Sequence, residues 1–235
     1  MKERPVIFNS EMVRAILSGR KTQTRRVIAN VSPDNCIPLQ KPTKTKDGIY
    51  THVMDAPGHG LCPFGQVGDR LWVRETWADV NHDGHPAIAY RADGGLRVIG
   101  EDDGEEEDPN LEKYWFAQWY ADLISGAEGN WRPSIHMPRW ASRITLEITA
   151  VRVERLNDIS EEDAKAEGVR AIENNFGNGP SYCDYLLPNL DDTAEWYNRA
   201  SDSFKSLWKS IYGAESWRAN PWVWVIEFRR VEVEK

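Results

Sequence analysis

The segment RITLEITAVRVERL, residues 143–156, carries the strongest β-strand pattern in the sequence. Apolar and polar residues alternate from Ile144 to Ala150, which is typical of a strand that buries one face. From Val151 onward the apolar residues take the other parity, and this change predicts a bulge or a sharp bend of the kind that closes a barrel. We therefore expect a long, bent strand at the centre of the fold.

Weaker patterns on both sides of this segment predict a mixed α+β protein. The other expected strands are residues 5–8, 70–77, 87–91 and 222–228. The expected helices are residues 10–19, 111–123, 160–168 and 192–212. Ser10 and Ser160 are the expected N-caps, and Gly19 and Gly168 are the expected C-terminal caps. Residues 30–65 show no periodicity and are expected to form a long loop.

Composition narrows the class of protein. The chain has 235 residues, 40% hydrophobic and 28% charged, which is typical of a folded globular protein. It has no run of about 18 apolar residues and no apolar signal core at its N-terminus, so we expect a cytoplasmic protein without a membrane partner. The cysteines Cys36, Cys62 and Cys183 lie far apart and favour free thiols. No histidine or cysteine spacing matches a metal site, so we expect neither metal nor cofactor.

The net charge hides a local pattern. There are 29 Lys and Arg against 37 Asp and Glu, for a net charge of −8, which argues against non-specific coating of nucleic acid. The run 101–108 alone holds seven carboxylates and is typical of a solvated loop. The first 30 residues hold seven Lys or Arg against two Glu. The acidic total is therefore compatible with a basic site for a nucleotide-like ligand.

Three segments carry side chains suited to chemistry. Residues 19–26, GRKTQTRR, are too polar and basic for a buried turn. Residues 72–77, WVRETW, place Glu75 on the apolar face of a strand, so this carboxylate lies either in water at the strand end or inside beside a partner. Glu167 falls in the last turn of a helix, where the helix dipole disfavours an anion. It is therefore either exposed or held by a cation.

These segments resemble the ASCH domain, the activating-signal-cointegrator homology domain. The resemblance also rests on the Gly68-Asp69 turn, the strand from Ile144 to Val153 and the closing strand that ends in Val225-Ile226-Glu227-Phe228. It covers about half of the chain and implies a PUA-like fold, a small β-barrel with flanking helices. The chain is then one domain over residues 1–235, with insertions at about 30–65, 79–138 and 170–203. Residues 72–77 and 137–143 are similar to segments of ASCH proteins carried by phages and prophages.

The resemblance also implies an activity. Small bacterial members of the family are amidohydrolases that remove the acyl group from N4-acetylcytidine. By this resemblance Lys21 is the base, Thr24 the nucleophile and Glu167 the proton shuttle, and the substrate is a small modified cytidine. The chemistry agrees, because a threonine hydroxyl needs a base and burial beside cations lowers the pKa of a lysine. The further candidates for substrate binding are Thr22, Arg26, Arg74, Glu75, Trp77 and Arg143.

Plainer interpretations of the same residues stay open. Lys21, Arg25 and Arg26 also suit a basic patch for phosphates, and Glu167 also suits an exposed helix position. Two other functions follow from the same fold, a non-catalytic RNA-binding module and a metal-independent ribonuclease. Release of cytidine from N4-acetylcytidine indicates the amidohydrolase, whereas RNA binding that weakens steeply with salt indicates the binding module.

Overall fold

The computed structural model describes residues 1–39, 50–99, 114, 116–173, 179–190 and 196–231. These residues form a mixed α+β structure with several sheets, which confirms the expected fold class. The expected small barrel is not seen in these ranges. A barrel closes when the first and last strands of one sheet pair, and the strand orders of the described sheets include no such pair.

The chain forms two compact units, each built from separate stretches of sequence. Unit 1 comprises residues 1–2, 15–69 and 147–229, and unit 2 comprises residues 3–14, 70–146 and 230–235. Whether the two units together make the single domain expected from the sequence stays a prediction.

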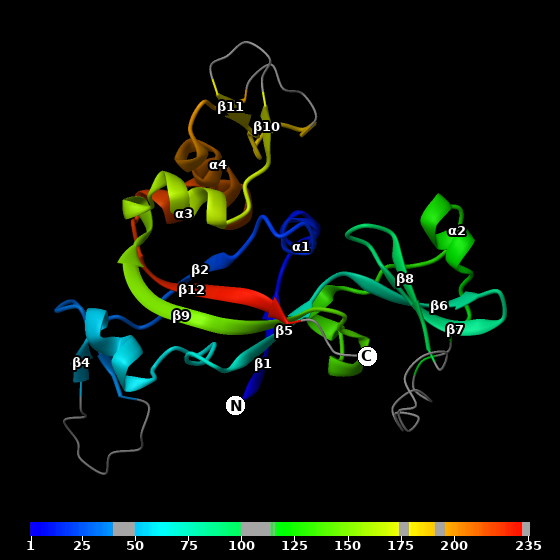
Figure 1. Cartoon of the computed structure of the whole chain (residues 1–235), viewed down its shortest axis with the longest axis horizontal. Coiled ribbons are helices and arrows are strands. Elements are labelled where there is room, and N and C mark those ends of the chain that lie inside the picture. The colour runs from blue at the N-terminus through cyan, green and yellow to red at the C-terminus, as the bar shows by residue number, and fades with distance from the viewer. Residues whose placement is uncertain (40–49, 100–113, 115, 174–178, 191–195, 232–235) are drawn as a thin grey trace. The chain divides into compact units, whose positions relative to one another are not determined.

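The main strands of unit 1 are the long β9 (Thr145–Arg155), β12 (Trp222–Val231) and β2 (Gln23–Val27), which neighbour one another in that order. The long strand expected from the sequence is thus confirmed, and its curvature is visible in Figure 1. The buried positions Ile148 and Val153 have opposite parity, as the pattern predicted. β12 pairs antiparallel with β2, and Thr24 faces Ile226 across the pair.

Three helices complete this part of unit 1: α3 (Glu161–Ala166), α4 (Ala200–Tyr212) and α5 (Ala214–Arg218). α3 and α4 lie side by side over β2 and β12 (Figure 1). The Ser160 hydroxyl accepts a hydrogen bond from the Asp163 N–H at 3.0 Å, so the expected N-cap of α3 is confirmed. The expected helix over 192–212 is wrong at its start, because Tyr197 forms a β-bridge with Tyr182. Residues 191–195 lie outside the described ranges.

Unit 1 also contains two short hairpins. One pairs β3 (Cys36–Pro38) with β4 (Tyr50–His52), which continues into a 3-10 helix over Val53–His59. The other pairs β10 (Ala171–Glu173) with β11 (Pro180–Tyr182). The expected long loop over 30–65 is therefore partly wrong. Three-residue strands are too short to show periodicity, although Ile37 and Val53 are buried.

Unit 2 combines a parallel strand pair with a separate three-stranded sheet. β1 (Glu3–Ile7) runs parallel to β5 (Arg70–Arg74). The sheet consists of β6 (Trp77–His82), β7 (His85–Tyr90) and β8 (Gly95–Val98). The expected strand over 70–77 is in fact two strands, because β5 ends at Arg74 and Trp77 opens β6. Trp77, Ile88, Tyr90, Met137 and Ala141 form the core on one side of this sheet.

Two helices differ in detail from their sequence patterns. α1 (Ser10–Leu17) is capped by Asn9, whose side-chain oxygen accepts from the Met12 N–H at 2.9 Å, so Ser10 is not the cap. The second helix, α2, spans Tyr120–Ser125, and residues 111–113 and 115 of the expected range 111–123 lie outside the described residues. Gln118 and Trp119 pair with Asn81 instead of forming helix.

Three further expectations concern the acidic run, membrane-spanning helices and the cysteines. The acidic run 101–108 lies outside the described residues. Within the described ranges no helix is long and apolar enough to span a membrane. Cys36, Cys62 and Cys183, all of which lie within the described ranges, form no disulfide with one another.

Candidate functional site

Lys21 contacts α1 through its backbone N–H and the C-terminal end of α3 through its side chain. Its N–H donates to the Ala15 carbonyl at 3.0 Å, and the next N–H, of Thr22, donates to the Ala166 carbonyl at 2.8 Å. The Lys21 ammonium donates to the main-chain oxygen of Glu167 and to its carboxylate Oε2, both at 2.8 Å. Both side chains are buried, with exposed fractions of 0% and 2%. The sequence alternative in which a cation holds Glu167 is therefore the correct one.

Gly168 makes this close approach possible. Its φ is +85°, a conformation in which glycine has no steric cost. A Cβ at this position would lie 2.7 Å from the Lys21 Cβ and 2.8 Å from the Ala15 Cβ. Both the backbone angle and the space therefore require glycine where α3 ends beside Lys21.

Arg25 shares the carboxylate of Glu167 with Lys21. Its Nη1 donates to Glu167 Oε1 at 3.1 Å, while Lys21 occupies Oε2. Its Nη2 donates to Asp163 Oδ2 at 3.1 Å and to Glu154 Oε2 at 3.0 Å. The guanidinium is fully buried. One buried arginine thus connects three carboxylates from α3 and β9.

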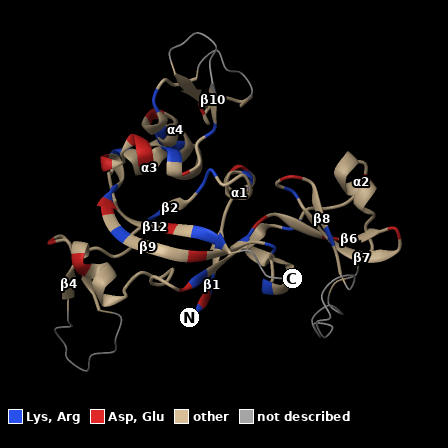
Figure 2. Ribbon diagram, in the orientation of Figure 1, with Lys and Arg blue, Asp and Glu red and all other residues tan. Residues whose placement is uncertain are grey.

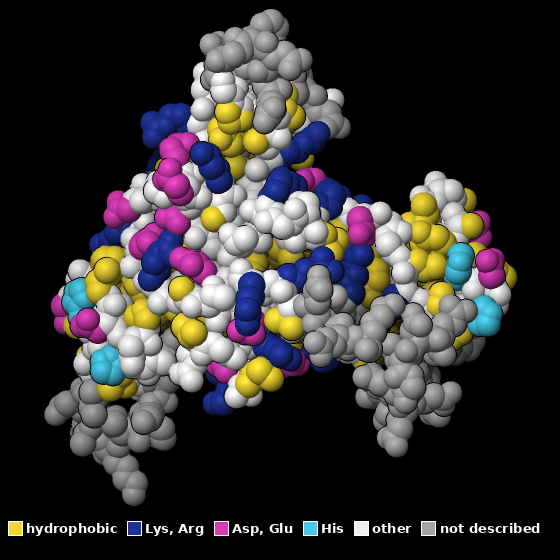
Figure 3. Space-filling model, viewed as in Figure 1, with side chains coloured by type: hydrophobic (Ala, Val, Ile, Leu, Met, Phe, Trp, Pro, Cys, Tyr) yellow, Lys and Arg dark blue, Asp and Glu magenta, His cyan; other side chains and the backbone are white. Residues whose placement is uncertain are grey.

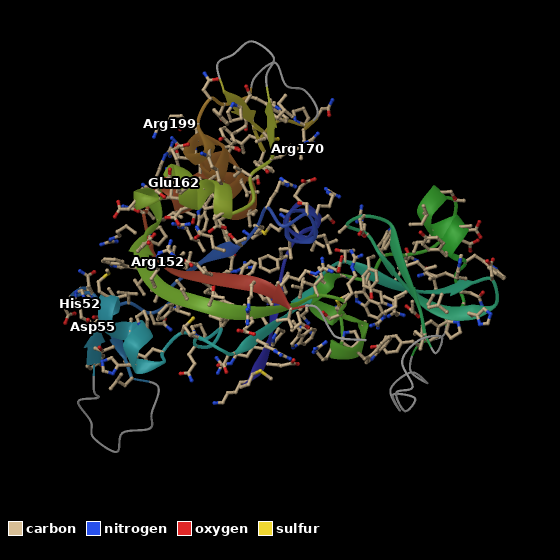
Figure 4. The ribbon with its side chains drawn as sticks, viewed as in Figure 1. His52, Asp55, Arg152, Glu162, Arg170 and Arg199 are labelled. Carbon is tan, nitrogen blue, oxygen red and sulfur yellow. The ribbon has the colours of Figure 1, made fainter. Side chains whose placement is uncertain are left out.

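The ion pairs continue from this buried centre to the surface of unit 1. Arg152 donates to Asp163 Oδ1 at 2.7 Å and also pairs with Glu154 and Glu227. Arg152 lies on β9 beneath α3 (Figure 4). Figure 2 shows basic and acidic segments alternating along β9 and α3, and Figure 3 shows their side chains interspersed on this face. Lys21 is therefore the inner end of a connected ionic network.

The network shifts the pKa values of Lys21 and Asp163. Burial lowers the pKa of Lys21, and the charges of Arg25 and Arg26 lower it further against the opposing effect of Glu167. Burial raises the pKa of Asp163, but Arg25 and Arg152 more than offset this and leave it below its usual value. Burial and the two arginines thus outweigh Glu167 and leave the pKa of Lys21 below its ordinary value.

Thr24 lies on β2, on the face opposite to that of Gln23 and Arg25. Gln23 donates to the Asp163 carbonyl at 3.0 Å, and Arg25 contacts Glu167, so both side chains face α3. Successive side chains of a strand point to opposite faces, so Thr24 points away from α3. It is 2% exposed. The structure therefore brings Lys21 and Glu167 together and leaves Thr24 on the opposite face of β2.

The other two candidates from unit 1 lie nearer the surface. Thr22 is exposed, and its backbone joins α3 to β12 through Ala166 and Phe228. Arg26 is half-buried, and its Nη1 donates to the Tyr212 hydroxyl at 3.2 Å.

Glu75 and Arg143 form a separate clamp in unit 2. Arg143 donates from Nε and Nη2 to the two oxygens of Glu75 at 2.9 and 3.0 Å, and it also pairs with Asp93 at 2.8 Å. Its guanidinium lies 4.0 Å from the centre of the Tyr90 ring. Glu75 is 1% exposed, so it is the inward carboxylate with a partner. Burial raises its pKa despite the opposing charge of Arg143.

The remaining two candidates are also structural members of unit 2. Arg74 donates to the Met137 carbonyl at 2.9 Å and stacks on Trp72, with its Cζ 5.0 Å from the ring centre. Trp77 is fully buried among Tyr114 and Trp140, so its ring belongs to the core.

Unit 2 also carries a concavity of about 370 Å³. Its lining residues are Asp79, Ala117, Gln118, Asn130 and Arg132. None of the candidate site residues lines it. Within the described ranges no group of three or more His, Cys, Asp or Glu side chains could hold a metal ion.

Several members of the ionic network were not singled out from the sequence. They are Gln23, Arg152, Glu154, Asp163 and Glu227. The spacing of Asp163 and Glu167, four residues apart on one helix face, was an available signal. Comparison of the chain with known protein families, curated proteins and solved structures finds no match.

Proposed function

We propose that this protein is an amidohydrolase that removes the acyl group from N4-acetylcytidine and related N4-acylated cytosine nucleosides, on a PUA-like fold. The observation that carries the proposal is the buried contact between Lys21 Nζ and the Glu167 carboxylate, at 2.8 Å. A buried amine whose pKa is lowered is suited to act as a general base. Both residue types are those that the ASCH resemblance implies.

In the proposed reaction the neutral Lys21 amine takes the proton of the nucleophile. The nucleophile oxygen then forms a bond to the acyl carbon, and the bond from that carbon to the cytosine N4 breaks. The Lys21 ammonium, with Glu167 as shuttle, returns the proton to the departing N4 amine. If Thr24 is the nucleophile, water then hydrolyses the acyl-threonine ester by the same base chemistry.

The role of Thr24 rests on the resemblance, because strand alternation turns its side chain away from α3. A water molecule activated by Lys21 is the competing nucleophile. The two mechanisms share Lys21 and Glu167 and differ only in the covalent intermediate.

The test is chromatography of N4-acetylcytidine incubated with the purified protein. We expect cytidine to appear with the wild type and to be lost in Lys21→Met and Glu167→Gln. Lys165→Met is the matched control, because Lys165 is an exposed lysine on α3 and its loss leaves the pair intact. No cytidine from the wild type, or equal release by Lys21→Met, contradicts the proposal. Salt-sensitive RNA binding without hydrolysis would instead indicate the RNA-binding module.

A further inference from the structure

Asp163 on α3 and Glu167, the C-terminal cap of α3, share one counter-ion. Asp163 and Glu167 are four residues apart, so they are neighbours on the helix surface, where like charges repel. Here both also lose water, since Glu167 is 2% exposed and Asp163 is 22% exposed. Arg25 contacts both of them, through Nη2 and Nη1 respectively, at 3.1 Å each. A single cation from β2 therefore bridges the two acids.

We propose that Arg25 is a positioning residue for the Lys21–Glu167 pair. Its guanidinium holds one oxygen of Glu167 and thereby turns the other oxygen toward Lys21. The catalytic meaning of this role rests on the proposed function, whereas the geometry stands without it.

The guanidinium is itself held rigidly. Asp163 and Glu154 fix Nη2, and the Phe204 ring lies 5.8 Å from the guanidinium carbon. A planar fork with two fixed donors suits this role, whereas the single ammonium of a lysine cannot reach several carboxylates in one geometry. Rotation of the Glu167 carboxylate away from Lys21 would break its bond to Arg25. The orientation of Glu167 is therefore set from β2 as well as from α3.

The shared carboxylate has a measurable effect on Lys21. The charged groups that shift the pKa of Lys21 include Glu167, directly after α3, and Arg25 and Arg26 on β2. Removing Arg25 removes a like charge close to Lys21, and this favours the ammonium form. Arg25→Gln should therefore raise the pKa of Lys21.

The experiment is a pH titration of the full chain labelled with ¹³C at the lysine Cε, followed by NMR. The Lys21 resonance is the one missing from Lys21→Met. In Arg25→Gln we expect the Lys21 midpoint to move upward by about one pH unit. Arg152→Gln is the matched control, because Arg152 contacts Asp163 and Glu154 but not Glu167. In this variant the Lys21 midpoint should equal that of the wild type. An unchanged or lower midpoint in Arg25→Gln overturns the proposal.

Circular dichroism shows whether Arg25→Gln folds. If it does not fold, a second variant provides the same test. Arg25→Gln with Asp163→Asn removes one charge of each sign and should show the same upward shift. Arg25→Lys keeps the charge but not the fork, so the Glu167 carboxylate is no longer held toward Lys21 and the Lys21 midpoint should fall below that of the wild type. Hydrolysis of N4-acetylcytidine is measured in parallel, and its optimum should move to higher pH in Arg25→Gln. A midpoint shift in a protein that hydrolyses nothing supports the positioning role and contradicts the proposed function.

Discussion

The backbone of Gly168 lies directly against the side chain of Lys21. The position that a Cβ on Gly168 would take is 2.7 Å from the Lys21 Cβ, closer than two carbon atoms pack. We expect Gly168→Ala to lower the free energy of unfolding by about 1–3 kcal/mol, through the clash and the positive φ together. Urea denaturation measures this loss. The displaced Lys21 should also lose its contact with Glu167, so that hydrolysis falls more than stability explains.

A matched variant separates the two causes. Gly19 has a similar φ of +75°, but a Cβ there would meet nothing within 4 Å. Gly19→Ala should therefore lower the free energy of unfolding only through the strained backbone angle. If the two variants lose equal stability and equal activity, the contact between Gly168 and Lys21 has no special role.

The lowered pKa of Lys21 predicts how stability depends on pH. Between this lowered pKa and about 10.5, the unfolded chain holds a proton on Lys21 that the folded chain has released. Stability rises with pH wherever the unfolded state binds more protons, so Lys21 makes the free energy of unfolding increase across this window. Lys21→Met should abolish that increase, and Lys165→Met should retain it. Urea denaturation at a series of pH values up to 10 provides the comparison, and parallel curves for the wild type and Lys21→Met would contradict the expectation.

The nucleophile can be identified at Thr24. If its hydroxyl attacks the acyl carbon, Thr24→Ala should lower the rate of cytidine release by about two orders of magnitude or more, while Thr24→Ser retains much of it. Mass spectrometry of the rapidly quenched wild type should then detect an acyl group on this residue. A Thr24→Ala protein that keeps its rate, when Lys21→Met loses it, would assign the attack to water.

The clamp in unit 2 should matter for stability rather than for the reaction. Arg143 donates to both oxygens of the buried Glu75 and also to Asp93, a pattern that a lysine cannot reproduce. We expect Arg143→Lys to cost about 2 kcal/mol or more of unfolding free energy. Arg139→Lys is the control, because its pair with Glu3 is largely exposed, and the cost there should stay below about 1 kcal/mol. A similar cost for both variants would contradict the structural role of the clamp.

Features that depend on local chemistry were predictable from the sequence. The alternation of apolar and polar residues over 143–156 predicted β9, and Ser160 and Gly168 predicted the two ends of α3. The conflict between the Glu167 carboxylate and the helix dipole also pointed to a cation at that position. Each of these arguments needs only residues that are close together along the chain.

Features that depend on distant pairing were not predictable in this way. Arg25 contacts Asp163 although the two residues are 138 positions apart in the sequence. Only the pairing of β2 with β12 beneath α3 brings them together. Tyr197 likewise continues an apolar helical stripe in the sequence but pairs with Tyr182, because tertiary pairing overrides helix propensity. The Thr24 side chain points away from α3 because of its position along β2. The Lys-Thr-x-Thr pattern alone does not indicate this direction.

The antiparallel pairing of β2 with β12 joins residues 23–27 to residues 223–227, about 200 positions further along the chain. At ribosomal elongation rates of 5–20 residues per second, β2 waits roughly 10–40 seconds for its partner to be synthesised. Contacts of such high sequence separation form slowly, and an unpaired strand edge is prone to associate with other chains in the meantime. A nascent chain that stalls before residue 222 would therefore be a natural client for chaperones that bind exposed strands.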